Sequence, residues 1–516
     1  MRGMNRAVLL AALLATASAV VAQSPAWRWR RTEDLGCLTP PAALAQVGMS
    51  GTDLGVSFPQ GDRLVFLFGD SWTLDRQDWD HDSVAFTKLA PLGDALPELR
   101  WSTQASGRFR TLAPKDMVQR GMDVPVEGVV VDGRTYVFFS SGFHDKRKVH
   151  SHSMLVHGKD DDLRELELDH RVETKKFVNV SVIEGDADVL WIYGTGAYRK
   201  SSVFLARVAR DRLADRSSWR YWPEFSPNEA DARPLVHSDC IGELSVRRVP
   251  GSDVICMAYN ASQPRGIHLR TATSPTGPWS DPEVIFDPFR DAGYGVHMHQ
   301  STDATGYDDG LSMPGREREW GGEYGPYLVP EWCDAETPGV LSLVYTLSTW
   351  NPYTVRLLRT VVVREGVDWS PPESPAIRGP EKSTAKNLAF EKGRLRGWKQ
   401  EGDAFVTYLH DDGSHAVLTY VKPRGDAVHG RLWQEFTLST TARELRGTVH
   451  GGSEEVQLWH GDRLVYRTSG RRSNDVDVPF RWRLDELRGE KVRLQIVDAS
   501  TAPWGFVAVR GLHIVE

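Results

Sequence analysis

The stretch that decides the fold is GTDLGVSF at residues 51–58, followed after a short turn by LVFLFGDSW at residues 64–72. Both runs are rich in β-branched and aromatic residues, and the turn between them carries proline and glycine, so the pair predicts a β-hairpin. Asp53 opens the first predicted strand and Asp70 closes the second. Because these ends of an antiparallel hairpin lie side by side, the two carboxylates are expected to be close together. Neighbouring carboxylates suit acid–base chemistry; the alternative is that Asp53 caps a turn and Asp70 belongs to an ordinary Gly-Asp turn.

Four more hairpins of this kind follow, and their first strands begin at Glu127, Asn179, Glu243 and Tyr327. A second recurring unit lies between the hairpins and is clearest at residues 267–280, IHLRTATSPTGPWS, with weaker versions at 202–219 and 353–359. Helical patterns are almost absent between about Arg28 and Glu365. Five such pairs at a spacing of about sixty residues predict four-stranded blades, and therefore a five-bladed β-propeller.

In a propeller the first strand of each blade lines the central channel, so the residues that open these strands are expected to meet in one funnel. The expected funnel residues are Asp53, Glu127, Asn179, Glu243 and the pair Tyr324 and Tyr327. Acids and aromatic residues that converge from five segments predict a site. The alternative is that the innermost strand ends are simply solvated.

The composition narrows the class of function. A chain of 516 residues is too long for one ordinary core, so two or more domains are expected. The formal net charge is −7 and no long basic run occurs, which argues against nucleic acid as a partner. The 18 tryptophans suit stacking on sugar rings, although core packing explains many tryptophans equally well.

Residues 1–22 have the pattern of a secretory signal peptide. Arg2 and Arg6 form the positive start, residues 7–15 the apolar centre and residues 19–22 the small-residue cleavage region. The apolar run is too short for a membrane span, and no later segment is long and apolar enough. The sequence therefore predicts a soluble, monomeric protein that is secreted or periplasmic.

Four cysteines, Cys37, Cys240, Cys256 and Cys333, fit an oxidising compartment. A bridge between Cys240 and Cys256 would leave Cys37 and Cys333 to tie the chain start to a late segment; the alternative is four unpaired thiols. No Cys or His spacing indicates zinc. No cofactor is required, and the presence of a structural cation is left open.

The propeller is predicted at residues 23–368, and a proline-rich linker follows at 369–386. Short strands then continue through residues 387–516, which predicts a β-sandwich of the jelly-roll type. The fold class is therefore all-β, with two domains after the signal peptide.

The first hairpin, at residues 52–55 and 68–72, resembles a bacterial propeller family long labelled as a domain of unknown function. Some members of that family are endo-acting D-arabinofuranases that cut mycobacterial arabinan. The similarity continues at residues 242–246 (GELSV), 324–327 (YGPY) and 348–353 (STWNPY), and it spans most of residues 45–365. The C-terminal part resembles jelly-roll carbohydrate-binding modules.

The resemblance implies a five-bladed fold, glycoside hydrolysis and catalysis by the acids of the first blade. Asp53 would be the nucleophile or base, and Asp70 its partner or the acid. Glu243 is the alternative acid, from its place in the expected funnel and by analogy with other five-bladed glycosidases that use three acids. Such enzymes need one protonated and one ionised carboxyl group, and close acids raise one another's pKa.

The expected substrate-binding residues are Trp72, Glu127, Asn179, Tyr327, Trp350, His297 and His299. The two histidines alternate along an apparent strand in an insertion, residues 291–323, that has no counterpart in the family pattern. They would contact sugar or a metal, or else have a structural role.

The sequence thus predicts a secreted glycoside hydrolase that acts on a polysaccharide, with an arabinan as one possibility. The alternative is an exported, non-catalytic glycan-binding protein that uses the same funnel as a lectin does.

Overall fold

The structure is a computed structural model of the chain. It describes residues 26–75, 81–93, 95–114, 121–291, 293–294, 297–299, 311, 313, 316, 319–371, 378–410, 412–470 and 472–516. The predicted signal peptide lies outside the described residues, as does the part of the predicted linker at 372–377.

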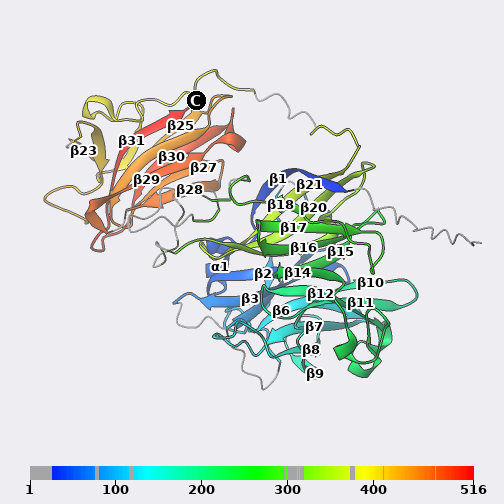
Figure 1. The fold of residues 1–516 in the computed structure, drawn as a ribbon. Helices are drawn as coiled ribbons and strands as arrows, with labels where there is room; N and C mark the ends of the chain where they lie inside the picture. The colour runs from blue at the N-terminus through cyan, green and yellow to red at the C-terminus, as the bar shows by residue number, and fades with distance from the viewer. Residues whose placement is uncertain are drawn as a thin grey trace, which may run out of the picture.

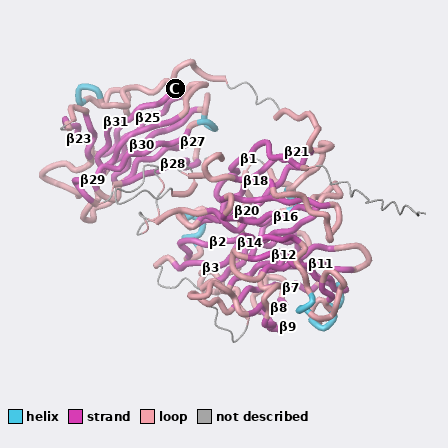
Figure 2. The backbone as a smooth tube through the Cα atoms, viewed as in Figure 1, coloured by secondary structure: helices cyan, strands magenta, loops and turns pink. Residues whose placement is uncertain are grey.

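The predicted fold class is confirmed, because five antiparallel sheets are followed by two more that form a sandwich (Figures 1 and 2). The first two blades are β2 (Met49–Gln60), β3 (Arg63–Thr73), β4 (His81–Lys88) and β5 (Arg100–Trp101), then β6 (Val124–Val131), β7 (Arg134–Ser141), β8 (His152–Gly158) and β9 (Leu166–Glu173). The third blade is β10 (Asn179–Glu184), β11 (Val189–Thr195), β12 (Ser201–Ala209) and β13 (Arg220–Tyr221), with β14 (Val236–Ile241) paired to β12. The fourth is β15 (Leu244–Arg248), β16 (Ile255–Ser262), β17 (Arg265–Ala272) and β18 (Glu283–Phe286).

The fifth blade joins the two ends of the propeller. It contains β19 (Glu323–Leu328), β20 (Val340–Thr349) and β21 (Thr354–Arg364), and its outermost strand is β1 (Trp27–Cys37). Strand β1 pairs with β21 in a register that runs from Trp27 opposite Arg364 to Cys37 opposite Arg356. The first described strand therefore closes the ring.

The innermost strands β2, β6, β10, β15 and β19 are neighbours in that order, and β19 returns to β2. Residues on both faces of each blade pack against the next blade, which explains the near-continuous apolar runs that the strands show. One such layer holds Val137 and Phe139 of β7 against Val56 and Phe58 of β2. This packing fixes the inner strand ends around one axis.

All four cysteines are unpaired, so neither predicted bridge forms and the alternative of free thiols describes the structure. Cys240 lies on β14 and Cys256 on β16. These strands are in contact, but the two thiols do not form a disulfide. Cys256 and Cys333 are buried in the same apolar cluster, where they act as small hydrophobic residues.

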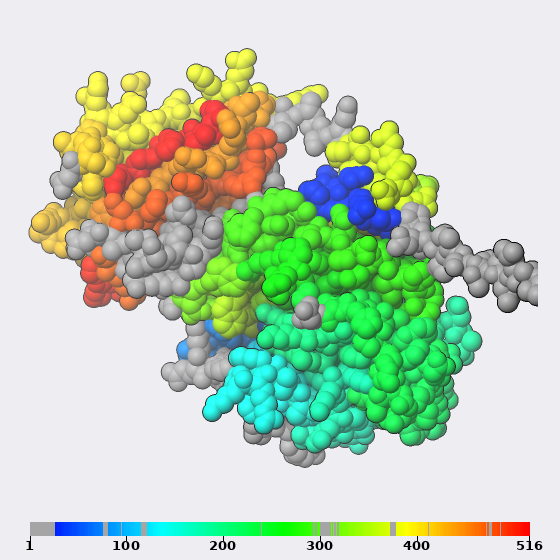
Figure 3. Space-filling model, viewed as in Figure 1, coloured from blue at the N-terminus to red at the C-terminus, as the bar shows by residue number. Residues whose placement is uncertain are grey.

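The second part of the chain is a sandwich of two five-stranded sheets, and Figure 3 shows it as a lobe of its own. One sheet contains β22 (Lys399–Gly402), β25 (Gly430–Thr437), β30 (Lys491–Asp498), β27 (Glu455–His460) and β28 (Arg463–Ser469). The other contains β23 (Val406–Leu409), β24 (His415–Leu418), β31 (Val507–Val515), β26 (Glu444–Gly451) and β29 (Ser473–Arg483). Trp482 and Leu432 are fully buried between them.

Helical structure is limited to α1 (Pro41–Gln46) and short 3₁₀ turns among the described residues, the latter at Arg210–Arg212, Arg216–Ser218, Glu229–Asp231, Pro330–Trp332, Glu391–Gly393 and Asp485–Leu487. Within the described part of the chain, no helix has the length and apolar character that a membrane crossing needs.

Candidate active site

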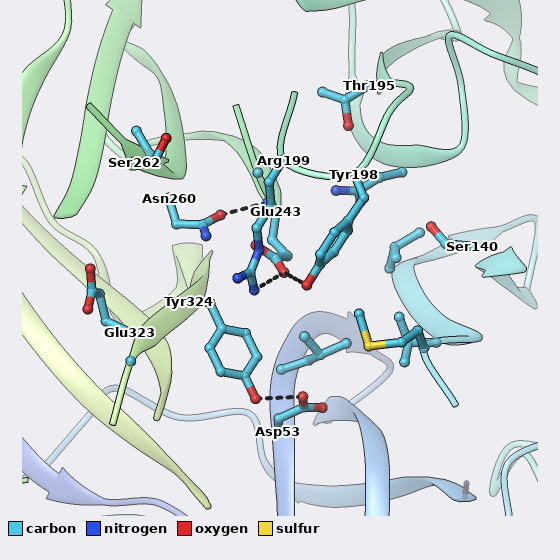
Figure 4. Close-up of a pocket in the computed structure, with 18 of the residues that line it drawn as sticks. Asp53, Ser140, Thr195, Tyr198, Arg199, Glu243, Asn260, Ser262, Glu323 and Tyr324 are labelled. Carbon is cyan, nitrogen blue, oxygen red and sulfur yellow. Dashed lines mark hydrogen bonds and ion pairs between the residues drawn. The ribbon is translucent and has the colours of Figure 1, made fainter. Parts of the chain in front are cut away.

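A cavity of about 590 Å³ lies where the inner strands of all five blades meet. Its lining includes Asp53 of β2, Val126 of β6, Asn179 of β10 and Tyr327 of β19, together with Glu243 immediately before β15. The five segments that were expected to deliver the funnel residues therefore surround one cavity (Figure 4).

Asp53 lies within β2, opposite Gly69 of β3, at a place where the strand is irregular. The following residue, Leu54, has a φ of +66°, and Asp70 has a φ of +22°. Non-glycine residues in this region are strained by about 1–3 kcal/mol each, and such strain gathers at functional sites. The irregularity interrupts the alternation of the hairpin, and the side chains of Asp53 and Asp70 both line the cavity.

The Asp53 carboxyl group is almost completely buried. The hydroxyl of Tyr324 donates a hydrogen bond of 2.8 Å to Oδ2, whereas Oδ1 has no hydrogen-bond partner among the described residues. Burial raises the pKa of Asp53 to about 6; the hydroxyls of Tyr324 and Tyr353 oppose this shift, and the charge of Glu243 adds to it. A carboxyl group with this pKa is partly protonated near neutral pH.

Glu243 is held in a different environment. Arg199 Nη2 donates a 2.9 Å hydrogen bond to Glu243 Oε1, and the Glu243 backbone N–H donates to Asn260 Oδ1 at 2.8 Å. Oε2 is buried and has no partner in the described part of the chain. Burial alone lowers the pKa of Arg199, but the charge of Glu243 outweighs it and raises the pKa, so the guanidinium stays charged beside the carboxylate.

The third carboxyl group belongs to Asp70, whose Oδ1 accepts a 3.2 Å hydrogen bond from the backbone N–H of Met122. Burial raises the pKa of the Tyr198 hydroxyl, and the charges of Glu243, Asp53 and Asp70 raise it further. One phenol therefore lies within electrostatic range of all three acids. The three predicted catalytic acids thus line the same cavity as Tyr198, whose hydroxyl lies 3.4 Å from Glu243 Oε1.

A family model described as "Domain of unknown function (DUF4185)" matches residues 39–359. The chain belongs to this family. The match covers the propeller except for the closing strand β1 and the end of β21. No curated protein matches the sequence.

Several solved structures are similar to the chain that carries this DUF4185 domain. An exo-beta-1,3-galactanase from Phanerochaete chrysosporium has 10% identity and a TM-score of 0.43, with 93% of this chain and 100% of that chain covered. An arabinoxylan arabinofuranohydrolase of glycoside hydrolase family 43 from Bacillus subtilis has 11% identity and a TM-score of 0.34, with 93% and 98% covered. The catalytic domain of a GH62 alpha-L-arabinofuranosidase from Coprinopsis cinerea has 12% identity and a TM-score of 0.37, with 66% and 97% covered.

Of the predicted substrate-binding residues, Asn179, Tyr327 and Trp350 line the cavity of the DUF4185 domain. Asn179 Oδ1 and the Tyr327 hydroxyl are buried and have no hydrogen-bond partner among the described residues. Trp72 is not in the described lining; it stacks on Tyr353 with ring centres 4.5 Å apart and meets Trp350 edge-on. It therefore supports the wall from behind.

Glu127 is outside the described cavity lining, although it is on an inner strand. Its carboxylate accepts two 2.7 Å hydrogen bonds from Arg247 of β15, and further bonds from Ser181 and the backbone of Val182 and Gly128. This buried ion pair ties three blades together around the axis. The role that the structure supports for Glu127 is therefore structural.

The two predicted histidines also lie outside the described lining. The described residues 293–294 and 297–299 form no strand, contrary to the prediction, and an isolated bridge pairs Tyr294 with Met298. His297 is buried with Nδ1 3.7 Å from Asp34 Oδ2, and burial lowers its pKa to about 4. In the described part of the chain no cluster of His, Cys, Asp and Glu could hold a metal ion.

Several lining residues were not predicted. Arg199 and Tyr198 lie in a turn after the third hairpin, and Asn260 lies near the end of β16 in the fourth blade. Glu323 is held by Arg265 through two short hydrogen bonds, of 2.8 Å to Oε1 and 2.6 Å to Oε2. For these residues the sequence offers one signal, which is that Tyr198 and Arg199 directly follow the hairpin that carries the inner strand of the third blade.

Proposed function

We propose that the DUF4185 domain is a glycoside hydrolase whose acids are Asp53, Glu243 and Asp70. The observation that carries the proposal is that two carboxyl groups of one cavity each have one oxygen held and one oxygen without a partner. Tyr324 holds Oδ2 of Asp53, and Arg199 holds Oε1 of Glu243. Their free oxygens, Oδ1 and Oε2, are the two functional atoms that cleavage of a glycosidic bond requires.

The environments of the two groups support different roles. Asp53 has a pKa raised to about 6 and has Oδ2 occupied, so its proton resides on Oδ1 and can pass to the leaving oxygen. Glu243 forms an ion pair with the guanidinium of Arg199 through Oε1, and its Oε2 can activate water or attack the anomeric carbon. This assignment makes Asp53 the acid, in contrast to its sequence-based role as nucleophile or base.

Asp70 supplies a third carboxyl group in the same cavity. The transition state of glycoside hydrolysis resembles an oxocarbenium ion, so a nearby carboxylate stabilises the positive charge that develops on the sugar. The finer proposal is that the substrate is an arabinan, which rests on the family resemblance of the first hairpin. Export of the protein is likewise proposed from the signal-like residues 1–22, and the chemistry requires no cofactor.

The proposal is tested by incubating the full chain with a panel of bacterial and plant polysaccharides, arabinan first, and measuring new reducing ends. Loss of the general acid or of the base is expected to reduce the rate by about 10²–10⁴-fold, so Asp53→Asn and Glu243→Gln should fall by that amount. Asp162→Asn removes a carboxylate far from the cavity and is the matched control. Unchanged rates in the cavity variants would contradict the proposal.

The second candidate function is glycan binding without cleavage, which the buried polar atoms of Asn179 and Tyr327 also favour. It predicts that one polysaccharide is retained in an affinity gel while no reducing ends form. Binding of a lectin type would tolerate Asp53→Asn, whereas hydrolysis would not.

A further inference from the structure

Two tryptophans stand at the edge of the cavity on the fifth blade. Trp320 and Trp350 both line the cavity, and they expose 40% and 42% of their surface. The other large hydrophobic residues that are this exposed, among those described, do not line the cavity. Exposed aromatic rings beside a cavity that contains acids are a feature that core packing does not explain.

Each ring is fixed on one side by an arginine. Arg265 Cζ lies 3.8 Å from the ring centre of Trp320, and Arg316 Cζ lies 4.4 Å from that of Trp350. Arg265 is itself anchored by Glu323. A guanidinium stacked on the ring restricts its orientation, while the exposed part of each ring remains accessible to a ligand.

The two rings are also linked through the backbone. The Trp350 N–H donates a 2.8 Å hydrogen bond to the carbonyl of Gly322. A side chain at Gly322 would begin 2.7 Å from the ring of Trp320, so the glycine lets that ring lie close against the chain. The backbone that carries Trp350 is therefore joined directly to the short segment in front of β19 that carries Trp320.

The charges of the cavity favour an uncharged ligand. Four carboxyl groups line it, from Asp53, Asp70, Glu243 and Glu323, against two guanidiniums, from Arg199 and Arg265, so that acidic groups outnumber basic ones even with Asp53 protonated. Each guanidinium is paired with one of these carboxylates. Among the described lining residues no guanidinium is left over for an acidic sugar, and the excess of carboxylates would repel one.

We propose that Trp320 and Trp350 form a stacking platform that binds successive sugar units of an uncharged polysaccharide, beyond the unit held at Asp53. This inference rests on the proposed function for the position of the cleaved bond, but the platform itself is a binding site. Stacking adds about 0.5–1.5 kcal/mol per aromatic ring, or roughly a twofold to tenfold change in affinity. The platform therefore favours chains of several sugars over disaccharides.

The test uses the full chain with the Asp53→Asn substitution, so that bound glycan is not consumed. Retention is measured by affinity electrophoresis in gels that contain neutral arabinan, galactan or xylan, or acidic polygalacturonate. Trp320→Ala and Trp350→Ala are each expected to weaken retention by the neutral polysaccharide roughly twofold to tenfold, and Trp350→Phe to weaken it less. Trp29→Ala is the matched control, since Arg290 stacks on that ring at 3.6 Å outside the cavity.

The outcomes separate the platform from the hydrolase. Unchanged retention in both tryptophan variants, retention by polygalacturonate alone, or no retention by any neutral polysaccharide would each overturn the platform. Neutral retention that depends on both tryptophans, with no reducing ends formed by the unsubstituted chain, would keep the platform and reject hydrolysis. Hydrolysis with a KM for long chains that neither tryptophan substitution changes would keep the proposed hydrolase and reject the platform. Equal melting temperatures of the variants ensure that a loss of retention reflects the site.

Discussion

Asp53 and Glu243 show how the surroundings of a single residue decide what it can do. Asp53 lies within β2, not at its start as predicted, and Glu243 lies immediately before β15, yet one is buried beside phenols and the other beside a guanidinium. A neutral hydrogen-bond donor such as Tyr324 stabilises the ionised carboxylate only partly, so desolvation prevails at Asp53. At Glu243, by contrast, Arg199 supplies a full positive charge in a 2.9 Å ion pair.

Replacing Tyr324 by phenylalanine tests this balance. The Tyr324 hydroxyl favours the ionised form of Asp53, so Tyr324→Phe should raise the pKa of Asp53 further above about 6. A general acid is active while protonated, so activity falls as the pH rises through this pKa. The alkaline limb of the pH profile of kcat/KM is therefore expected to move to higher pH.

The matched control is Tyr345→Phe, which removes a buried hydroxyl that meets Thr360 away from the cavity. It should leave the profile in place. An alkaline limb that does not move in Tyr324→Phe, or that moves to lower pH, would show that Asp53 is not the acid.

At the level of elements, the strands of the first hairpin leave almost no space around the Asp53 carboxyl group. Gly69 faces Asp53 across the pair, and a Cβ atom at Gly69 would lie 2.8 Å from Asp53 Oδ1 and 2.8 Å from Val124 Cγ1. Val124 belongs to β6 of the next blade, so a side chain at Gly69 would have to displace either Asp53 or the neighbouring blade. The absence of a side chain at this position is what allows Asp53 to lie where it does.

Gly69→Ala should therefore displace the Asp53 carboxyl group while the sheet persists. A misplacement of about 1 Å can cost about 10²-fold in rate, so kcat/KM is expected to fall by roughly that factor. Gly93→Ala is the control, because a Cβ there would meet nothing within 4 Å. Full activity of Gly69→Ala would mean that the exact position of Oδ1 is unimportant.

The element level also shows what the sequence could predict. Alternation and turn residues are local signals, so the inner hairpins and their count followed from the sequence. The opening acid of a hairpin does not reveal its partner, however. Glu127 and Glu243 both open a predicted hairpin in the sequence. In the structure Glu127 forms an ion pair with Arg247 from another blade, whereas Glu243 lines the cavity.

The remaining differences have the same cause. The alternation of His297 and His299 resembles that of a strand, but the described residues there form none, and His297 lies beside Asp34 of β1. Arg199 lies in a turn by every local criterion, and only the ring of blades brings it to Glu243. Contacts between distant segments decide these positions, and a single sequence does not contain them.

On the scale of the whole molecule, the propeller and the sandwich have separate cores, so they are expected to unfold in separate transitions. The sandwich contains Asp498, whose carboxylate oxygens are both buried without a hydrogen-bond partner among the described residues. Burial raises its pKa to about 7 from 3.8; Thr419 opposes the shift, and the charges of Glu454 and Asp426 add to it.

A carboxyl group whose pKa is raised in the folded state destabilises that state once it ionises. Asp498 should therefore destabilise the folded sandwich progressively as the pH rises from about 4 to about 7, with no further change above it. Calorimetry is expected to show its melting temperature fall by roughly 5–10 °C over this range. Asp498→Asn should abolish most of this contribution and leave the propeller transition in place. A wild-type transition that is equally stable at pH 4 and pH 8, or an unaltered pH dependence in the variant, would contradict this role of Asp498.

The closure of the fifth blade by β1 has a consequence for the order in which the ring can form. Strand β1 can pair with β21 only after β21, more than three hundred residues later in the chain, has been synthesised. Until then the ring of blades stays open, with the edge of the fifth blade unpaired. The last step pairs β1 with β21, which are the two most distant segments of the propeller. Closure over so long a loop is slow, so the fifth blade is the place where an incomplete chain would expose unpaired strand edges to aggregation or to a chaperone.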